Sequence, residues 1–232
     1  MPPKAKFTRQ EIIDAAVDIA RRAPLEAVTA QELASVLGTS TRPVFTYFRT
    51  LEEVRAAVVE EAGKIYGRYV ERGLSMTPPF KGYGMETIRF AREEPNLFRL
   101  LFLRRRDTAE FPPTENHSAD IRRAIRETFS LTDAQADAAE LKESGWIISG
   151  RNEVGDVRGV ETIVKAIFGL CTLIVTGVND VPDTEAARLL GEVCRALLIA
   201  QRVPRDARTA IVPGKKVDAG ALGEYIAAPD KK

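Results

Sequence analysis

Apolar residues recur at helical spacing along most of the chain, and this pattern predicts an all-α fold. In the first periodic segment, Ile12, Ala16 and Ile19 share one face, and Thr8 with Glu11 three residues later forms a capping-box signature. No strand pattern and no internal repeat is visible. The expected helices span Phe7–Arg22, Thr29–Val36, Thr41–Phe48, Thr50–Arg72, the stretch from Pro79 to about Glu94, Asn96–Leu103, Ser118–Phe129, Thr132–Ser149, Val160–Val178 and Asp183–Arg202.

Proline and glycine residues separate these helical segments, and together with the loss of periodicity near the C-terminus they indicate the domain boundaries. Pro24, Gly38 and Pro95 end or separate helices, because proline restricts the residue before it and glycine accepts the left-handed conformation of a helix end. We expect an N-terminal domain over residues 1–49, a larger helical domain over residues 50–203 and a tail over residues 204–232, where the periodicity is lost after Pro204.

Composition and charge exclude several classes of protein. The 232 residues include 34 Lys and Arg against 33 Asp and Glu, a net charge of +1. This balance excludes a histone-like protein that binds polyanions over its whole surface, but it allows a local basic patch. Two cysteines, Cys171 and Cys194, cannot form a disulfide framework or a four-ligand zinc site. The longest apolar stretch is shorter than the roughly 20 residues of a membrane span, and the N-terminus lacks a signal-like apolar region, so we expect a cytoplasmic protein without a membrane partner.

The single histidine limits nucleophilic catalysis. His117 would have to serve any Ser-His or Cys-His pair, and its polar neighbours favour a surface position instead. Gly82-Tyr83-Gly84 is too short for a dinucleotide fingerprint, and no phosphate-binding loop is present in the sequence. We therefore expect no catalytic residue, no cofactor and no metal site.

The first fifty residues have the outline of a helix-turn-helix. The helix Thr29–Val36 is followed by the turn Leu37–Thr39 and a short helix opened by Ser40. Such a second helix projects far enough to enter the major groove of DNA. Residues 1–50 carry seven basic and five acidic side chains, a modest local excess of positive charge.

The residue types in this outline suit double-stranded DNA. Arg42 can bond a guanine through two N–H groups, and Pro43 can contact a thymine methyl. Tyr47 and Thr29 can contact phosphates. The expected DNA-binding residues are Lys4, Lys6, Thr29, Gln31, Ser40, Thr41, Arg42, Pro43, Tyr47 and Arg49.

Other interpretations of the same outline stay open. A helix-turn-helix pattern also occurs in helical hairpins that only build a core, and Val44, Phe45 and Phe48 are expected in the core rather than against DNA. Pro43 disfavours helical geometry at Arg42, which conflicts with a helix that begins at Thr41.

The run from Val28 to Phe48, with Ile12, Ala15, Ala16 and Ala20 before it and Arg49–Val54 after it, resembles the N-terminal domain of the TetR family of transcriptional regulators. The segment Phe90–Phe102 is similar to a stretch common in the C-terminal domains of that family. Two positions depart from the pattern: Phe45 stands where the family usually has tyrosine, and Leu51 where it often has lysine. Each change removes a phosphate partner.

The last two expected helices are more apolar than one buried stripe requires, which favours a homodimer. The resemblance implies the same, because such helices form a four-helix dimer interface in the family. Closure of the monomer core is the alternative interpretation, and the two cysteines are expected to be buried there. The expected interface residues are Ile163, Ile167, Leu170, Ile174, Leu190, Val193 and Leu197.

The resemblance also implies an effector pocket in the middle helices, which are rich in aromatic residues. Aromatic rings at helical spacing are equally typical of a core, so both interpretations stay open. The expected pocket residues are Tyr83, Phe90, Phe98, Phe102, Trp146 and Phe168.

Together these features predict a dimeric, ligand-responsive regulator, most simply a repressor, that binds a palindromic operator and is released by a small hydrophobic or aromatic effector. Two alternatives use the same helices: a protein-binding adaptor, and an enzyme whose acid-base groups would come from Glu86, Glu140 and Glu143.

Overall fold

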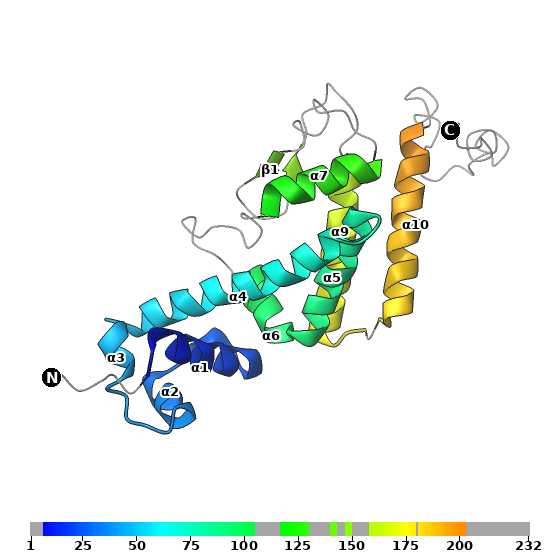
Figure 1. Cartoon of the computed structure of the whole chain (residues 1–232). Helices are drawn as coiled ribbons and strands as arrows, with labels where there is room; N and C mark the ends of the chain where they lie inside the picture. Colours follow the sequence, from blue (N-terminus) through cyan, green and yellow to red (C-terminus); the bar gives the residue numbers. More distant parts are fainter. Residues whose placement is uncertain are drawn as a thin grey trace.

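The computed structural model describes residues 7–104, 117–129, 140–142, 147–149, 158–179 and 181–202. The predicted helical class is confirmed: Figure 1 shows short helices at one end of the molecule, joined by the long α4 to a taller bundle. The elements are α1 (Arg9–Arg22), η1 (Leu25–Ala27), α2 (Ala30–Val36), α3 (Val44–Tyr47), α4 (Leu51–Leu74), α5 (Pro79–Glu93), α6 (Pro95–Phe98), η2 (Arg99–Leu103), α7 (Ser118–Phe129), β1 (Glu140–Lys142), β2 (Ile147–Ser149), α9 (Arg158–Thr176) and α10 (Asp183–Arg202).

Threonine caps set the starts of α1, α2 and α4, and the one at α1 is the capping box that the sequence predicts. At α1, the Thr8 hydroxyl accepts from the Glu11 N–H at 3.1 Å, and the Glu11 carboxylate accepts from the Thr8 N–H at 2.6 Å, so the capping box is complete. Thr29 and Thr50 accept in the same way from the N–H groups three residues on, each at 3.2 Å. These bonds satisfy donors that the first turn of a helix leaves unpaired.

The third helix is shorter than the sequence pattern predicts. It spans Val44–Tyr47 rather than Thr41–Phe48, and Ser40 does not cap it. Pro43 disfavours helical backbone at Arg42, so the residues before Val44 form a turn, closed by a bond from the Val44 N–H to the Thr41 carbonyl at 3.2 Å. The expected start of this helix at Thr41 is therefore wrong, and the effect of Pro43 on the backbone of Arg42 explains why.

Two further segments differ from the predicted helices. Residues 140–149, expected inside a helix from Thr132, contain the antiparallel strands β1 and β2, with Leu141 opposite Ile148. Gly145 and the β-branched pair Ile147-Ile148 disfavour a helix there. The expected helix Asn96–Leu103 divides into α6 and the wider turn η2.

A pair of glycines allows α4 and α5 to touch backbone to backbone. A Cβ built on Gly82 would lie 2.1 Å from the carbonyl oxygen of Gly73, and one built on Gly73 would lie 2.7 Å from the Gly82 oxygen. Two residues further along α5, a Cβ on Gly84 would meet Ile167 of α9 at 3.0 Å. The triplet Gly82-Tyr83-Gly84 therefore serves close helix packing.

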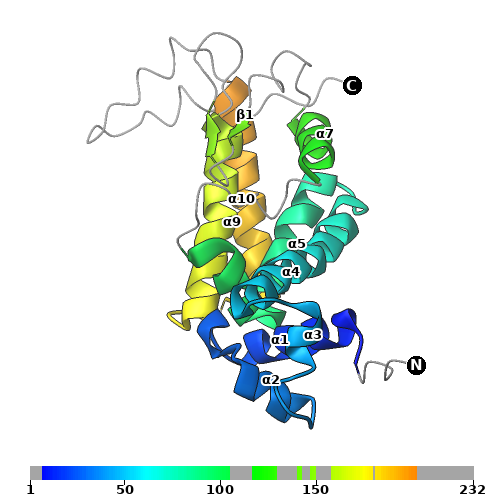
Figure 2. The same cartoon turned by 90° about the vertical axis from the view of Figure 1, so that its left-hand side faces the viewer.

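The helices α9 and α10 run antiparallel, as the short connection between them predicts (Figure 1 and Figure 2). Gly177 ends α9 in the left-handed region, with φ of 70°. One face of α9, formed by Val164, Ile167, Cys171 and Val175, is buried in the core of the chain. In α10, Ala186 and Leu190 are buried.

Within the part of the chain that the structure describes, every helix is too short or too polar to cross a lipid bilayer. The same residues contain no cluster of three or more His, Cys, Asp or Glu side chains arranged to hold a metal ion.

The prediction that Cys171 is a buried, small apolar residue is confirmed. Its side chain has no exposed surface, and its sulfur lies 3.8 Å from the Thr87 carbonyl oxygen. Burial raises the pKa of the Cys171 thiol well above its ordinary range, because a thiolate would be poorly solvated there. The side chain of Cys194 lies outside the described part.

Because the thiolate is the reactive form, Cys171 should react with iodoacetamide at pH 8 at least ~100-fold more slowly in the folded protein than in urea. Peptide mass spectrometry over a time course measures this site separately from Cys194. Equal rates in the two conditions would contradict the buried position.

Candidate nucleic-acid interface

The N-terminal helices pack around α1, whose buried face carries Ile12, Ala16 and Ile19. Its first turn also contacts the residue that follows α3, because the guanidinium of Arg9 lies 5.0 Å from the centre of the Phe48 ring. α1 therefore fixes the end of α3 from one side.

The turn after α2 depends on Gly38, which has φ of 58°. This confirms the predicted left-handed helix end, where a side chain would be strained. The Thr39 N–H donates to the Ala34 carbonyl at 2.9 Å, and the Gly38 N–H donates to the Ser35 carbonyl at 3.2 Å. The turn brings the chain from α2 to the segment Ser40–Pro43.

Two apolar side chains attach α3 to the core. Val44 and Phe48 are 0% and 2% exposed, as predicted, and they lie one helical turn apart. The helix is also tied to the preceding turn, because the Thr46 hydroxyl donates to the Arg42 carbonyl at 3.4 Å. The rest of α3 faces away from the core as a consequence.

The side chains on this outer face include one that the sequence pattern misplaces. Arg42, Thr46 and Tyr47 are exposed, and so is Phe45, at 48%. The expectation that Phe45 belongs to the core is wrong, because a helix that begins at Val44 points its second residue outward. Val36 at the end of α2 is also exposed.

The predicted DNA-binding residues fall into two groups. Those on α2, the turn, α3 and the entry to α4 lie in one N-terminal unit, where Gln31, Ser40, Arg42, Tyr47 and Arg49 are exposed and the others half-buried. The half-buried members are Thr29, Thr41 and Pro43. Lys4 and Lys6 lie outside the described residues.

The entry to α4 is held by a bond from the Arg49 N–H to the Glu53 carboxylate at 2.8 Å. The Arg49 side chain stays exposed beside this bond. A second arginine, Arg55, donates to the Glu26 carbonyl at 3.3 Å and ties α4 to η1. The N-terminal unit is thus anchored to α4 at two points.

Four of the predicted effector residues, Phe90, Phe98, Phe102 and Phe168, form a cluster of aromatic rings. Tyr83, Phe90 and Phe98 have no exposed surface. Ring centres of Phe98 and Phe102 lie 4.9 Å apart, and those of Phe102 and Phe168 lie 5.1 Å apart. At these distances the rings pack directly against one another, as in a core. Trp146 lies outside the described residues.

Two residues of the predicted dimer interface are corrected. Ile167 and Leu190 are 1% and 2% exposed and pack against Gly84 of α5 within the same chain, so they are not available to a second copy. Leu170, Ile174 and Val193 are half-buried at the edge of the core. The side chains of Ile163 and Leu197 lie outside the described part.

His117 is less exposed than the sequence suggested. Its side chain is 14% exposed, its ring lies against Gly67 of α4, and its Nε2 is 3.2 Å from the Glu71 carboxylate. Among the candidate acid-base groups, the carboxylate of Glu86 is 1% exposed and accepts from Arg72 and from Arg89, one on each oxygen. Glu140 lies in β1, and Glu143 lies outside the described residues.

A scan of the chain against models of known protein families finds no match, and a search of curated proteins finds no relative.

Proposed function

We propose that the chain is a dimeric, ligand-responsive transcriptional regulator of the TetR kind, and that α3 with the turn before it binds the major groove of double-stranded DNA. The observation that carries the proposal is the outward face of α3. Val44 and Phe48 anchor the helix, while Arg42, Phe45 and Tyr47 are exposed on a unit that packs around α1.

The exposed side chains divide into two kinds of contact. The guanidinium of Arg42 can donate two N–H groups to O6 and N7 of a guanine, and the Phe45 ring can contact thymine methyl groups. Tyr47, Thr29 and Arg49 suit phosphates, which position a protein on DNA without reading sequence. Phe45 has no hydroxyl for a phosphate, so its contribution would be apolar.

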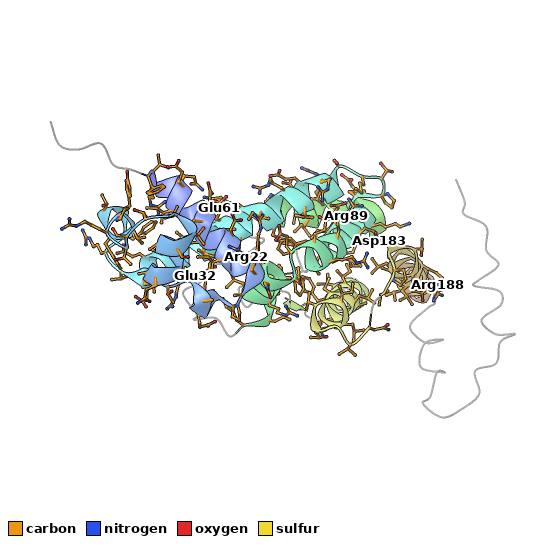
Figure 3. All side chains as sticks on the ribbon, turned by 90° about the horizontal axis from the view of Figure 1, so that it is seen from below. Arg22, Glu32, Glu61, Arg89, Asp183 and Arg188 are labelled. Carbon is orange, nitrogen blue, oxygen red and sulfur yellow. The ribbon has the colours of Figure 1, made fainter. Side chains whose placement is uncertain are left out.

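Dimerisation would supply the second half of the operator contact, since one short helix touches too few base pairs to be selective. The outer surfaces of α9 and α10 offer small and apolar residues: a Cβ on Gly169 or Gly191 would meet no atom within 4 Å, and Leu173 is 37% exposed. Arg188, labelled on α10 in Figure 3, pairs with Glu185 and Glu192 of its own helix. These two helix faces can approach a second copy closely.

In such a dimer an effector would act by a shift between two conformations. The conformation that binds DNA holds two copies of α3 at the separation of successive major grooves, about 34 Å. An effector that binds the other conformation better would lower operator occupancy, and a coupling of ~1–3 kcal/mol changes affinity roughly 5- to 150-fold.

Replacing Arg42 with alanine tests the direct reading of bases. On a fragment that the wild-type protein selects, R42A is expected to bind ~10- to 100-fold more weakly and to lose its preference at one base pair in each half-site. A gel-shift titration on the selected fragment and its single-base variants measures both effects.

The matched control is R68A, which removes the same charge from an exposed position of α4. Arg68 lies 17 residues beyond the start of that helix, roughly 26 Å along its axis. R68A should keep the base preference. If R42A and R68A behave alike, or if both proteins bind scrambled DNA as well as the selected fragment, the proposed reading of bases is wrong.

A further inference from the structure

A groove of about 440 Å³ lies where the end of α9 meets the corner between α5 and α6. It is separate from the aromatic cluster. It forms because α9 ends at Thr176, where Gly177 redirects the chain, and because Pro95 starts a new helix directly after α5. The volume is within the range of small-molecule sites.

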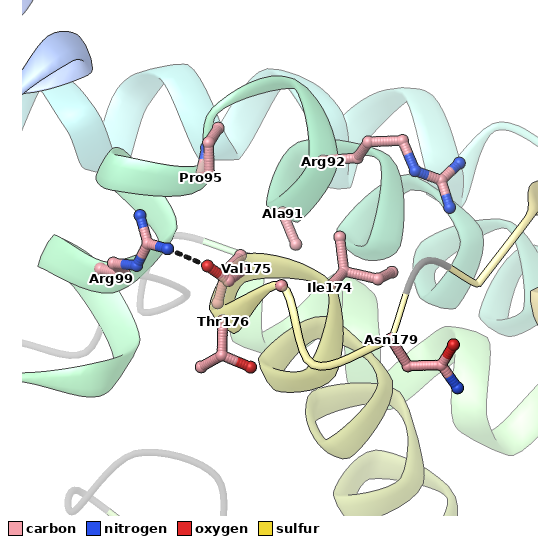
Figure 4. A pocket seen from close by; sticks show the side chains of 9 residues that line it. Ala91, Arg92, Pro95, Arg99, Ile174, Val175, Thr176 and Asn179 are labelled. Carbon is pink, nitrogen blue, oxygen red and sulfur yellow. Dashed lines mark hydrogen bonds between the residues drawn. The ribbon is translucent and has the colours of Figure 1, made fainter.

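The walls of the groove combine apolar surface with two positive charges. Ala91, Pro95, Ile174 and Val175 supply the apolar part. In Figure 4 the guanidinium of Arg99 lies at one end and that of Arg92 at the other. No aspartate or glutamate of the described residues lines the groove.

The two arginines differ in their partners. Arg92 pairs with Asp183 and also donates to the Val181 carbonyl. Arg99 donates to the amide oxygen of Asn96 at 2.8 Å and to the Val175 carbonyl, and within the described ranges it has no carboxylate at ion-pair distance. The five donors of a guanidinium exceed these two bonds, and its planar fork matches a carboxylate.

Carbonyl groups make the end of α9 partially negative, and the guanidinium of Arg99, which donates to the last turn, offsets this charge. The Val175 carbonyl accepts from Arg99, the Ile174 carbonyl from the Gly177 N–H at 3.1 Å, and the Leu173 carbonyl from the Asn179 N–H at 3.5 Å. Those carbonyl oxygens are already paired.

We infer that this groove binds a small amphipathic anion, a carboxylate with an apolar body, whose charged group lies on Arg99. Charge complementarity selects the occupant: a cation would meet the guanidinium of Arg99, which has no carboxylate at ion-pair distance among the described residues, and a neutral apolar molecule would leave the bonding capacity of Arg99 unused. The apolar wall between the two arginines would cover the body of the ligand.

The groove is connected to the N-terminal unit through Asn96. The Asn96 amide accepts from Arg99 through its oxygen and donates through its nitrogen to the Arg21 carbonyl of α1 at 2.8 Å. Beside it, Glu94 accepts from the Arg21 side chain at 3.1 Å through both carboxylate oxygens. A bound carboxylate that turns the Arg99 guanidinium toward itself would loosen the bond from Arg99 to Asn96, and Asn96 would then hold the Arg21 carbonyl of α1 less firmly. This consequence rests on the proposed function, whereas the binding does not.

Titration of the full chain with sodium octanoate and with 1-octanol, by calorimetry or by ligand-observed NMR, tests the site. Octanoate is expected to bind saturably with one site per chain, and octanol, which has the same chain length without the charge, at least ~10-fold more weakly. Equal affinities for the two ligands, or no saturable binding of octanoate up to about 10 mM, would overturn the inference.

Variants locate the binding on the surface. R99Q should weaken octanoate binding ~10-fold or more, because a charge-assisted pair is lost. R123Q, at an exposed position of α7 paired only with Asp120 among the described residues, should leave it unchanged. Octanoate affinities within twofold for R99Q and the wild type would overturn the assignment to Arg99, and the ligand comparison stands even if R99Q does not fold.

A DNA-binding experiment distinguishes failure of this inference from failure of the proposed function. On a selected DNA fragment, octanoate should weaken binding of the wild type at least ~5-fold and that of N96A much less. If no fragment is selected but octanoate binds through Arg99, the proposed function is wrong, whereas the inference that the groove binds an amphipathic anion stands. If DNA is bound and octanoate has no effect on it, the connection through Asn96 is wrong.

Discussion

Truncating Phe98 to alanine should lower the free energy of unfolding by ~3–5 kcal/mol, the largest effect we expect from one substitution. The Phe98 ring is fully buried, and its centre lies 4.9 Å from that of Phe102 and 6.0 Å from that of Phe168. Removing it leaves a cavity among rings that α6, η2 and α9 hold in place. Denaturant unfolding followed by circular dichroism measures the change.

The matched control is V36A, which also removes apolar atoms but from a side chain that is 41% exposed. It should change stability by well under 1 kcal/mol. The comparison also distinguishes a core from a pocket wall, the two interpretations of the aromatic residues. If F98A were as stable as V36A, the rings would not form the packed core described above.

Adding a methyl group at Gly82 should destabilise the fold by about 3 kcal/mol, at the upper end for overpacking. The new Cβ would lie 2.1 Å from the Gly73 carbonyl oxygen and 2.6 Å from the Cβ of Met76. The first of these neighbours is backbone, so α4 and α5 would have to separate. Thermal unfolding of G82A measures the effect.

The control for this substitution lies in the same helix pair. At Gly63 of α4 a Cβ would meet nothing within 4 Å, so G63A should gain about 1 kcal/mol from helix propensity. Opposite signs for the two variants would establish the close approach of α4 and α5. Stabilisation by both would mean that the two helices do not touch at Gly82.

Local signals in the sequence predicted much of this fold. Thr8 and Glu11 defined the start of α1, Thr50 that of α4, and Gly38 the end of α2, because caps depend on residues within one turn of each other. The predicted bounds of α7 and α10 also agree with the structure. The exposed position of Arg42 followed from its place just beyond that turn.

Features that depend on distant contacts were missed or misplaced. Nothing in the spacing of α5 shows that Gly82 faces a backbone oxygen of α4. The apolar excess of α9 suggested a partner chain for Ile167, whereas α5 covers that residue within the same chain. Both outcomes depend on which helix faces which, and periodicity measures only how apolar a face is.

Pro43 allows the start of α3 at Val44 to be predicted from the sequence. A helix that starts there also predicts an exposed side chain for Phe45. A helix beginning at Val44 buries its first and fifth positions and exposes those between them. The groove between Arg92 and Arg99 left no sequence signal, because its walls come from segments about eighty residues apart.

Selection of bound fragments from a library of genomic DNA, using the purified chain at near-physiological salt, tests whether α3 reads DNA. We expect enrichment of a palindromic sequence with half-sites about one helical turn apart, bound more weakly as salt rises. Recovery of fragments with no shared sequence, or of none at all, would contradict the claim that α3 reads DNA.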